Sequence, residues 1–422
     1  MQDSEVDTTQ DDMAVIANGS MPNYSLMQLT AYHLKLGAVG FGGPVALVGY
    51  MHRDLVERRQ WISEAEYKEG LTLAQLMPGP LAAQLAIYLG YVHYGILGAT
   101  LVGLAFVLPS FLMVVVLGWA YLQFGGLAWM QAVFYGVGAA VIGIITISAY
   151  KLTAKTLSKD RLLWGIYLLS LVATVVTESE SIYLFLGAGI LVWLARTPPR
   201  FMRPKGATVQ GFLFPSLTAV LSGVSATPTQ ADVLVQIALF FTKAGAFVFG
   251  SGLAIIPFLY SGVVKEYGWL NEQEFLDAVA VAMITPGPVV ITVGFIGYLV
   301  MGRGGDPVAG FYGASVAALA TFLPCYFFTI IPAPYFKKHG KRPGIVAFVD
   351  GVTAAAVGAI AGACLVLGRR TIFPQSWVPE VPKIILLLVT LGLLLRFKKL
   401  PEPLVVLGAA VAGLVIYPFV HP

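Results

Sequence analysis

Two Pro-Gly-Pro segments, Pro78-Gly79-Pro80 and Pro286-Gly287-Pro288, stand inside apolar stretches of the chain. Proline lacks an amide donor and clashes with the preceding helical turn, so each segment must interrupt a helix. Pro80 and Pro288 suit the first position of a following half-helix. The exposed amides and the positive dipole end of such a half-helix form an anion site. The alternative is a simple kink packed against a neighbouring helix.

A glycine cluster precedes each segment. The residues are Gly42, Gly43 and Pro44 in the first part of the chain and Gly250, Ser251 and Gly252 in the second. Glycine permits positive φ and close backbone approach, although such clusters also serve tight helix packing. Lys35 and Lys243 each lie seven residues ahead of their cluster, inside apolar runs where an unpaired cation is costly. They are therefore candidate anion ligands, with snorkelling to the membrane surface as the alternative.

Amide and hydroxyl side chains accompany the breaks, namely Gln75, Gln84, Thr285 and Thr292. Carboxylates are missing from the apolar runs, apart from Asp232 and Asp350 near expected helix starts. This set favours an anion over a cation, and it predicts transport driven by the membrane potential without a carboxylate proton relay. The two cysteines and five histidines are scattered, so neither a metal site nor another cofactor is expected. No GxxxxGK[ST] motif supports an ATP-driven pump.

The composition places these residues in a membrane. Of the 422 residues, 57% are hydrophobic and 11% are charged, whereas globular domains carry roughly 25% charged residues. Several apolar runs exceed the ~20 residues that a helix needs to cross a bilayer. The sequence therefore predicts an all-α polytopic membrane protein whose surroundings are the lipid bilayer. A net charge of +4 gives no reason to expect nucleic acid as a partner.

The chain is an internal duplication. Trp61 aligns with Trp269, and the two Pro-Gly-Pro segments align with each other, at one spacing of 208 residues. The Leu-Pro pairs ending at Pro109 and Pro324 align at a spacing of 215. We expect a disordered acidic tail over 1–24, a first membrane domain over 25–196, a linker over 197–230 and a second membrane domain over 231–422.

The distribution of Lys and Arg indicates the topology of the two halves. If both Pro-Gly-Pro segments cross the membrane, the flanking basic residues divide evenly between the two sides. If each segment re-enters and returns to the same side, nineteen basic residues face five. Because basic residues concentrate on the cytoplasmic side, re-entry is favoured. Each half then crosses an odd number of times, which predicts two inverted halves, an arrangement found in many secondary transporters.

The motifs resemble those of the chromate ion transporter family. The matching segments are Phe41-Gly-Gly-Pro44, Leu73-Ala-Gln-Leu-Met-Pro-Gly-Pro80, Pro109-Ser110, Phe249-Gly-Ser-Gly252 and Thr285-Pro-Gly-Pro288. The resemblance runs from about residue 25 to the C-terminus, as in a long-chain, two-domain member. One departure is Ala46-Leu47-Val48, where many members have Ala-His-Ile. A histidine role at that point is therefore not carried over to this chain.

The resemblance implies export of chromate through a bacterial-type inner membrane, with chromate resistance as its consequence. It implies a secondary transporter rather than an enzyme, driven by the membrane potential or the proton motive force. A transporter of sulfate or another oxyanion, and an anion channel on the same scaffold, are the alternatives. The assembly is left open between a monomer and a homodimer.

Overall fold

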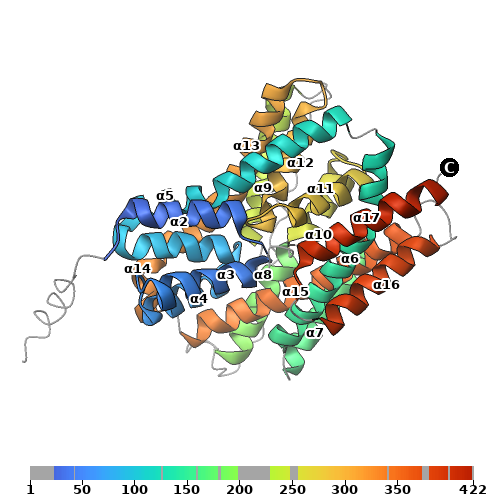
Figure 1. The fold of residues 1–422 in the computed structure, drawn as a ribbon. Coiled ribbons are helices and arrows are strands. Elements are labelled where there is room, and N and C mark those ends of the chain that lie inside the picture. Colours follow the sequence, from blue (N-terminus) through green and yellow to red (C-terminus); the bar gives the residue numbers. More distant parts are fainter. Residues whose placement is uncertain are drawn as a thin grey trace, which may run out of the picture.

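The computed structural model describes most of the chain outside its ends and the central linker. The described residues are 23–41, 43–124, 127–157, 160–178, 182–197, 229–247, 255–339, 342–372, 380–397 and 400–420. They form helices, with no strand among them (Figure 1). The expected tail and linker lie almost entirely outside this set, as do Gly42, Gly250, Ser251 and Gly252.

The helices before and after the linker follow a similar order, except that α5 corresponds to α12 and α13 together and that η5 and α14 have no counterpart among the described residues of the first half. The first half contains α2 (Leu26–Val39), α3 (Gly43–Met51), the π-helix η1 (His52–Arg58), α4 (Glu64–Leu76), α5 (Leu81–Phe124), α6 (Ala128–Leu157), α7 (Arg161–Thr177) and α8 (Ile182–Arg196). The second half contains α9 (Gln230–Phe247), α10 (Ile255–Tyr260), the π-helix η4 (Ser261–Glu266), α11 (Glu272–Ile284), the 3-10 helix η5 (Val289–Ile291), α12 (Thr292–Gly302), α13 (Pro307–Ile330), α14 (Ala333–His339), α15 (Pro343–Ile372), α16 (Val381–Arg396) and α17 (Glu402–Val420).

Five helices among the described residues are long and apolar enough to cross a membrane. They are α5, α6, α13, α15 and α17. The apolar helices α7, α8 and α12 are shorter. Many large apolar side chains on these helices are exposed, as expected of a surface that faces lipid rather than water. The chain is therefore a multi-pass helical membrane protein.

Local hydrogen bonds repeat between the two halves. The Trp61 amide donates to the Leu55 carbonyl oxygen at 2.9 Å, and the Trp269 amide donates to the Val263 carbonyl oxygen at 2.8 Å. Both bonds close a π-helix, η1 or η4, and each π-helix is followed by a helix that begins at a capping box. The duplication seen in the sequence thus extends to the backbone.

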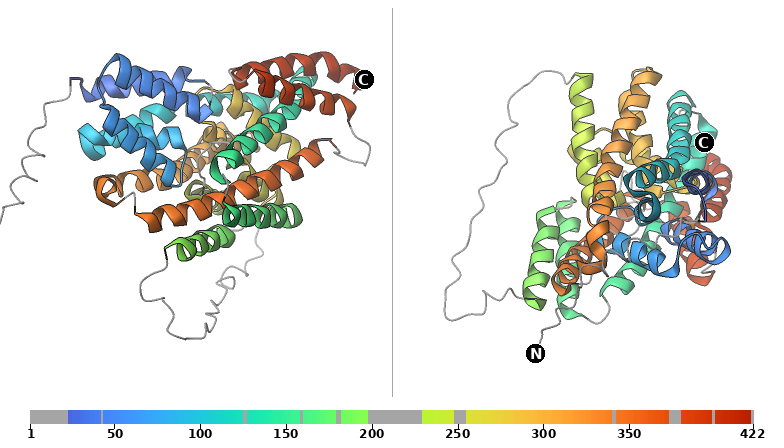
Figure 2. Two further views of the ribbon diagram at one scale, coloured as in Figure 1. Left: turned by 90° about the horizontal axis from the view of Figure 1, so that it is seen from below. Right: turned by 90° about the vertical axis from the view of Figure 1, so that its left-hand side faces the viewer.

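The two halves exchange their last helix pairs. Helices α7 and α8 of the first half pack on α15 of the second, while α16 and α17 of the second half pack on α6 of the first (Figures 1 and 2). Gly136 on α6 touches the Ala409 carbonyl on α17, and its repeat partner Gly351 on α15 touches the Ala188 carbonyl on α8. A β-carbon at either glycine would collide with that backbone, so glycine allows these helices to approach closely.

Short helical arms flank the first Pro-Gly-Pro segment. Gly95, with φ of +57°, divides α5 into two helices. Helix α4 and the first part of α5 run back along each other, since Gly70 packs against the ring of Tyr88. With 13 residues, α4 is ~20 Å long, less than the ~30 Å hydrocarbon core. The segment therefore lies at the tip of a helical hairpin.

Candidate functional site

The Pro-Gly-Pro segment of the second half meets the glycine break of the first half. The Gly287 amide donates a hydrogen bond to the Gly40 carbonyl oxygen at 2.9 Å. Gly287 has φ of +94°, and a β-carbon there would lie 2.7 Å from Ser110 Oγ and 3.1 Å from the Gly37 carbonyl oxygen. Both the backbone and the neighbours therefore require glycine. We call this meeting point the junction.

The Pro-Gly-Pro segment of the first half makes the reciprocal contact. Gly79 has φ of +140°, and a β-carbon there would lie 2.7 Å from Gln84 Nε2 and 3.0 Å from Cys325 Cβ. Cys325 follows Pro324 on α13, as Ser110 follows Pro109 on α5, at the spacing of 215 residues. Each segment thus packs on the proline-containing helix of the other half.

Pro80 and Pro288 were expected at the first position of the following helix. In the structure each of them lies one residue before that helix. Helix α5 begins at Leu81, and the Pro80 carbonyl oxygen accepts the first helical hydrogen bond from the Gln84 amide at 3.0 Å. Pro288 has an extended backbone with ψ of 122° and precedes the 3-10 helix η5. The prediction that Pro80 and Pro288 occupy the first helical position is therefore wrong by one residue. Each proline caps its helix because the chain is still extended as it leaves the glycine turn.

Three of the expected polar side chains hold the breaks in place. Gln84 is fully buried, and its Nε2 donates to the Pro78 carbonyl oxygen at 2.8 Å. The Thr292 hydroxyl donates to the Ala278 carbonyl oxygen at 2.9 Å, and the Thr285 hydroxyl donates one turn back within α11. Gln84 Oε1 is buried and has no partner among the described atoms. The three side chains therefore stabilise backbone carbonyls at the breaks, and Gln84 Oε1 is left without a donor among the described atoms.

Four other expected ligands line neither cleft at the junction. Lys35 on α2, Lys243 on α9 and Gln75 on α4 are exposed, and Pro44 on α3 is half-buried. No Lys or Arg side chain lines the clefts at the junction within the described residues. The two lysines therefore line neither cleft, and their role in anion binding stays a prediction.

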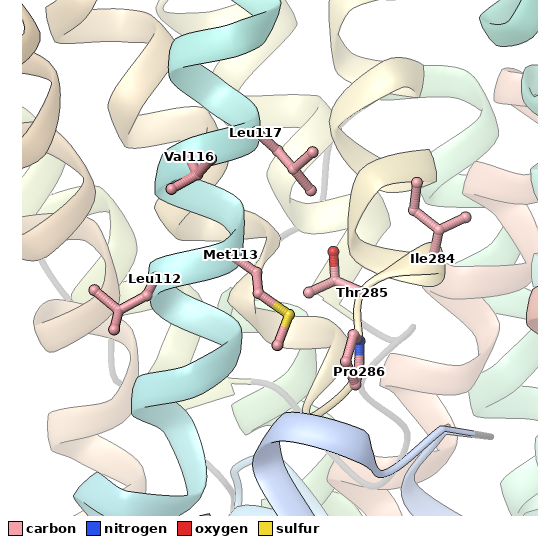
Figure 3. A pocket seen from close by; sticks show the side chains of 7 residues that line it. All are labelled: Leu112, Met113, Val116, Leu117, Ile284, Thr285 and Pro286. Carbon is pink, nitrogen blue, oxygen red and sulfur yellow. The ribbon is translucent and has the colours of Figure 1, made fainter.

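An apolar cleft opens on one side of the second break. It has a volume of about 460 Å³ and is lined by Leu112, Met113, Val116, Leu117, Ile284, Thr285 and Pro286. Figure 3 shows Met113 and Leu117 reaching from α5 toward Thr285, Pro286 and Ile284. The cleft lies between an α5 segment of the first half and the end of α11 in the second. Its lining suits an apolar occupant rather than a charged one.

A second, polar cleft lies on the other side of Thr285. Its lining comes from the first glycine break, the second Pro-Gly-Pro segment and the start of α17, and consists of Gly40, Phe41, Gly43, Met283, Thr285, Gly287, Val289, Glu402 and Pro403. Gly43 has φ of +72° and begins α3. Glu402 is therefore the one charged side chain in the described lining of this cleft.

The sequence analysis missed one carboxylate in the polar cleft and one buried carboxylate on α11. Asp277 on α11 is 4% exposed and accepts hydrogen bonds from Tyr121 at 2.7 Å and Gln273 at 2.8 Å. Glu402 is half-buried in the polar cleft. Asp277 and Glu402 each stand just before an apolar run. The lack of carboxylates within the apolar runs therefore did not exclude buried carboxylates from the folded protein. The available signal was the repeat: at the spacing of 208 residues Asp277 matches Glu69, so both halves have a carboxylate three residues after the capping glutamate.

The fold and the junction define a polytopic helical membrane protein made of two repeated halves that meet through broken helices. The sequence profile of the chromate transporter family matches residues 27–193 and 235–414, one segment in each half. The chain belongs to the chromate transporter family. Members of this family are transporters, so the protein is not an enzyme.

Curated relatives resemble the chain over nearly its whole length. A chromate transport protein of Cupriavidus metallidurans is 66% identical over 95% of both chains. A probable chromate transport protein of Synechococcus elongatus is 64% identical over 94% of this chain and 97% of its own. A chromate transport protein of Pseudomonas aeruginosa is 32% identical over 94% of each. No solved structure matches the chain.

Proposed function

We propose that this protein is a secondary transporter that exports chromate across the bacterial inner membrane and thereby confers chromate resistance. The observation that carries the proposal is the junction, where the breaks of two halves contact each other in a chain 66% identical to a chromate transport protein. Broken helices at the interface of two repeats are a common location for substrate sites in transporters. Sulfate or another tetrahedral oxyanion is the alternative substrate.

In this proposal the oxyanion binds at the helix starts that follow Gly79 and Gly287, where the first amides beyond Pro80 and Pro288 have no carbonyl partner in a preceding turn. Both glycines hold positive φ next to the start of a helix, which supports close approach of an anion to amide hydrogens. Lys35 and Lys243 enter as exposed cations that attract the anion before it reaches the breaks. Replacing each lysine by methionine should raise the apparent KM for chromate without reducing the amount of inserted protein. If both variants keep the wild-type apparent KM for chromate, the two lysines do not take part in anion binding and lie at the membrane surface.

Uptake of labelled chromate into inside-out vesicles tests the function directly. A transporter gives flux that saturates with chromate, and unlabelled sulfate competes only if it shares the site. Flux that rises linearly with concentration at conductance-like rates would support an anion channel instead. Saturable sulfate uptake that chromate does not inhibit would transfer the proposal to sulfate.

The two halves are proposed to be inverted, with the Pro-Gly-Pro hairpins re-entering the membrane. The helices next to the Pro-Gly-Pro segments support this topology. Helices α4, α11 and α12 are ~20, ~20 and ~17 Å long, so each is shorter than the ~30 Å hydrocarbon core. The variants Ile96→Cys and Gly304→Cys occupy matched, exposed turns, and both native cysteines are buried. Labelling from opposite faces is expected. Labelling of both from one face would contradict the inversion.

Export is proposed to draw on the membrane potential or the proton motive force. Moving one charge across 100 mV is worth ~2.3 kcal/mol. A dianion that leaves a negative interior therefore gains about 4.6 kcal/mol, enough for a gradient of roughly three decades. Imposing a potassium diffusion potential at equal pH, and then a pH step at zero potential, shows which force drives uptake into vesicles.

A further inference from the structure

The polar cleft contains an acidic side chain that the oxyanion proposal does not use. Glu402 is the first residue of α17, and its Oε2 lies 3.7 Å from the position that a β-carbon on Gly43 would take. Thr285 and Gly287 line the same cleft from the other side. The carboxylate therefore stands between the glycine break of the first half and the Pro-Gly-Pro segment of the second.

Few charges face this carboxylate. The charge of Lys151 on α6 attracts the Glu402 carboxylate electrostatically. The cleft lining from α3, the end of α11 and the first break carries no other titratable side chain. On α16, Lys383 pairs with Glu380, and the Asp277 carboxylate lies in the first half of α11. Glu402 forms no salt bridge within the part of the chain that the structure describes.

The cleft is too small for an oxyanion in the conformation described. It leaves about 10 Å³ for the centre of a water molecule, which is room for one water. A tetrahedral oxyanion can enter only if the two breaks separate. The anion would then lie beside a carboxylate in a low-dielectric site, where two like charges repel strongly. Protonation of the carboxylate removes that repulsion.

We propose that Glu402 takes up one proton when an oxyanion enters the polar cleft and releases it when the anion leaves, so that oxyanion binding is coupled to protonation of this residue. The inference rests on the proposed oxyanion function. By linkage, the affinity for a dianion rises as the pH falls, by up to about tenfold per pH unit while Glu402 is ionised in the free protein. The proton comes from solvent and forms the neutral carboxylic acid.

Calorimetric titration of the full chain in detergent micelles with sodium sulfate tests this coupling. Sulfate is a suitable probe because it remains a dianion between about pH 5 and about pH 8, where histidines and perturbed carboxyls titrate. Repeating the titration in buffers of different ionisation enthalpy gives the number of protons bound per sulfate. We expect close to one proton for the wild type and none for Glu402→Gln. Glu57→Gln, an exposed carboxylate outside the cleft, should behave as the wild type.

The outcomes separate the two proposals. Sulfate binding without proton uptake in the wild type, or proton uptake that persists in Glu402→Gln, would overturn the role of Glu402. If only chromate binds, the same titration is carried out at an alkaline pH where chromate is a dianion, and it is interpreted in the same way. If neither anion binds the wild type, the oxyanion function itself fails. Should Glu402→Gln not fold, a count of zero protons in the wild type still contradicts the proposal.

Discussion

Replacing Gly287 with alanine tests whether the junction is as tightly constrained as the structure indicates. The φ of +94° costs an alanine ~1–2 kcal/mol. The new β-carbon would lie 2.7 Å from Ser110 Oγ and 2.9 Å from Ser110 Cβ, and relieving that overlap costs ~1–3 kcal/mol. We therefore expect Gly287→Ala to lower the free energy of unfolding by about 2–5 kcal/mol.

A matched control separates backbone strain from crowding. Gly305 has φ of +81° but no atom within 4 Å of the position of a β-carbon. Gly305→Ala should therefore cost only the ~1–2 kcal/mol of strain. Chemical denaturation in detergent micelles measures both variants, and chromate uptake into vesicles shows whether the junction still functions.

The double variant Gly287→Ala with Ser110→Gly identifies the partner. Removing the serine side chain eliminates both short contacts but places a glycine in α5, at a cost of about 1 kcal/mol. The double variant should be more stable than the sum of the two single changes predicts, by ~1–3 kcal/mol. If Gly287→Ala is no more destabilising than Gly305→Ala, or if the two changes are additive, the packing argument is refuted.

Three further predictions concern the scaffold around the junction. Gly136→Ala should separate α17 from α6 and cost ~1–3 kcal/mol of unfolding free energy in denaturation experiments, whereas Gly408→Ala, with open space at its β-carbon position, should not. Gln84→Leu leaves a buried carbonyl of the first break without its donor, so stability should fall by ~1–3 kcal/mol and chromate uptake should fall with it. The hydrogen bond from His93 lowers the pKa of Glu66 from 4.5 to about 2, so its stabilisation of ~1 kcal/mol should be present above pH 4.5 and be lost as the pH falls to about 2. The thermal midpoint of Glu66→Gln should accordingly differ from that of the wild type at neutral pH and converge with it in acid.

The positions of the breaks could be predicted because their cause is local. A proline removes a donor wherever it stands, so Pro78 and Pro286 identify interruptions without any tertiary information. The spacing of 208 residues predicted the duplication, and the structure repeats a π-helix and a capping box at that spacing. The prolines that end the segments, Pro80 and Pro288, were placed one residue off, because the glycine turn before each of them keeps the chain extended for one further residue.

The partners of these elements could not be predicted from the sequence. Helices such as α6 and α15 are apolar on all sides, so their periodicity does not indicate which face meets which helix. The exposure of Lys35 and Lys243 was also not evident from their position in apolar runs. The burial of Asp277 depends on Tyr121, which is 156 residues away in the chain. Such long-range pairs leave no local pattern.

The exchange of helix pairs restricts how the transporter can change its conformation. Because α16 and α17 pack on α6, while α7 and α8 pack on α15, each bundle contains helices from both halves of the chain. Tyr417 on α17 donates a hydrogen bond to Gln131 on α6 across 286 residues of sequence. Rotation of one half as a rigid body would break the packing of α16 and α17 on α6 and of α7 and α8 on α15. For the proposed transport cycle, movement of the short Pro-Gly-Pro hairpins against the long helices is the motion that leaves these interfaces intact.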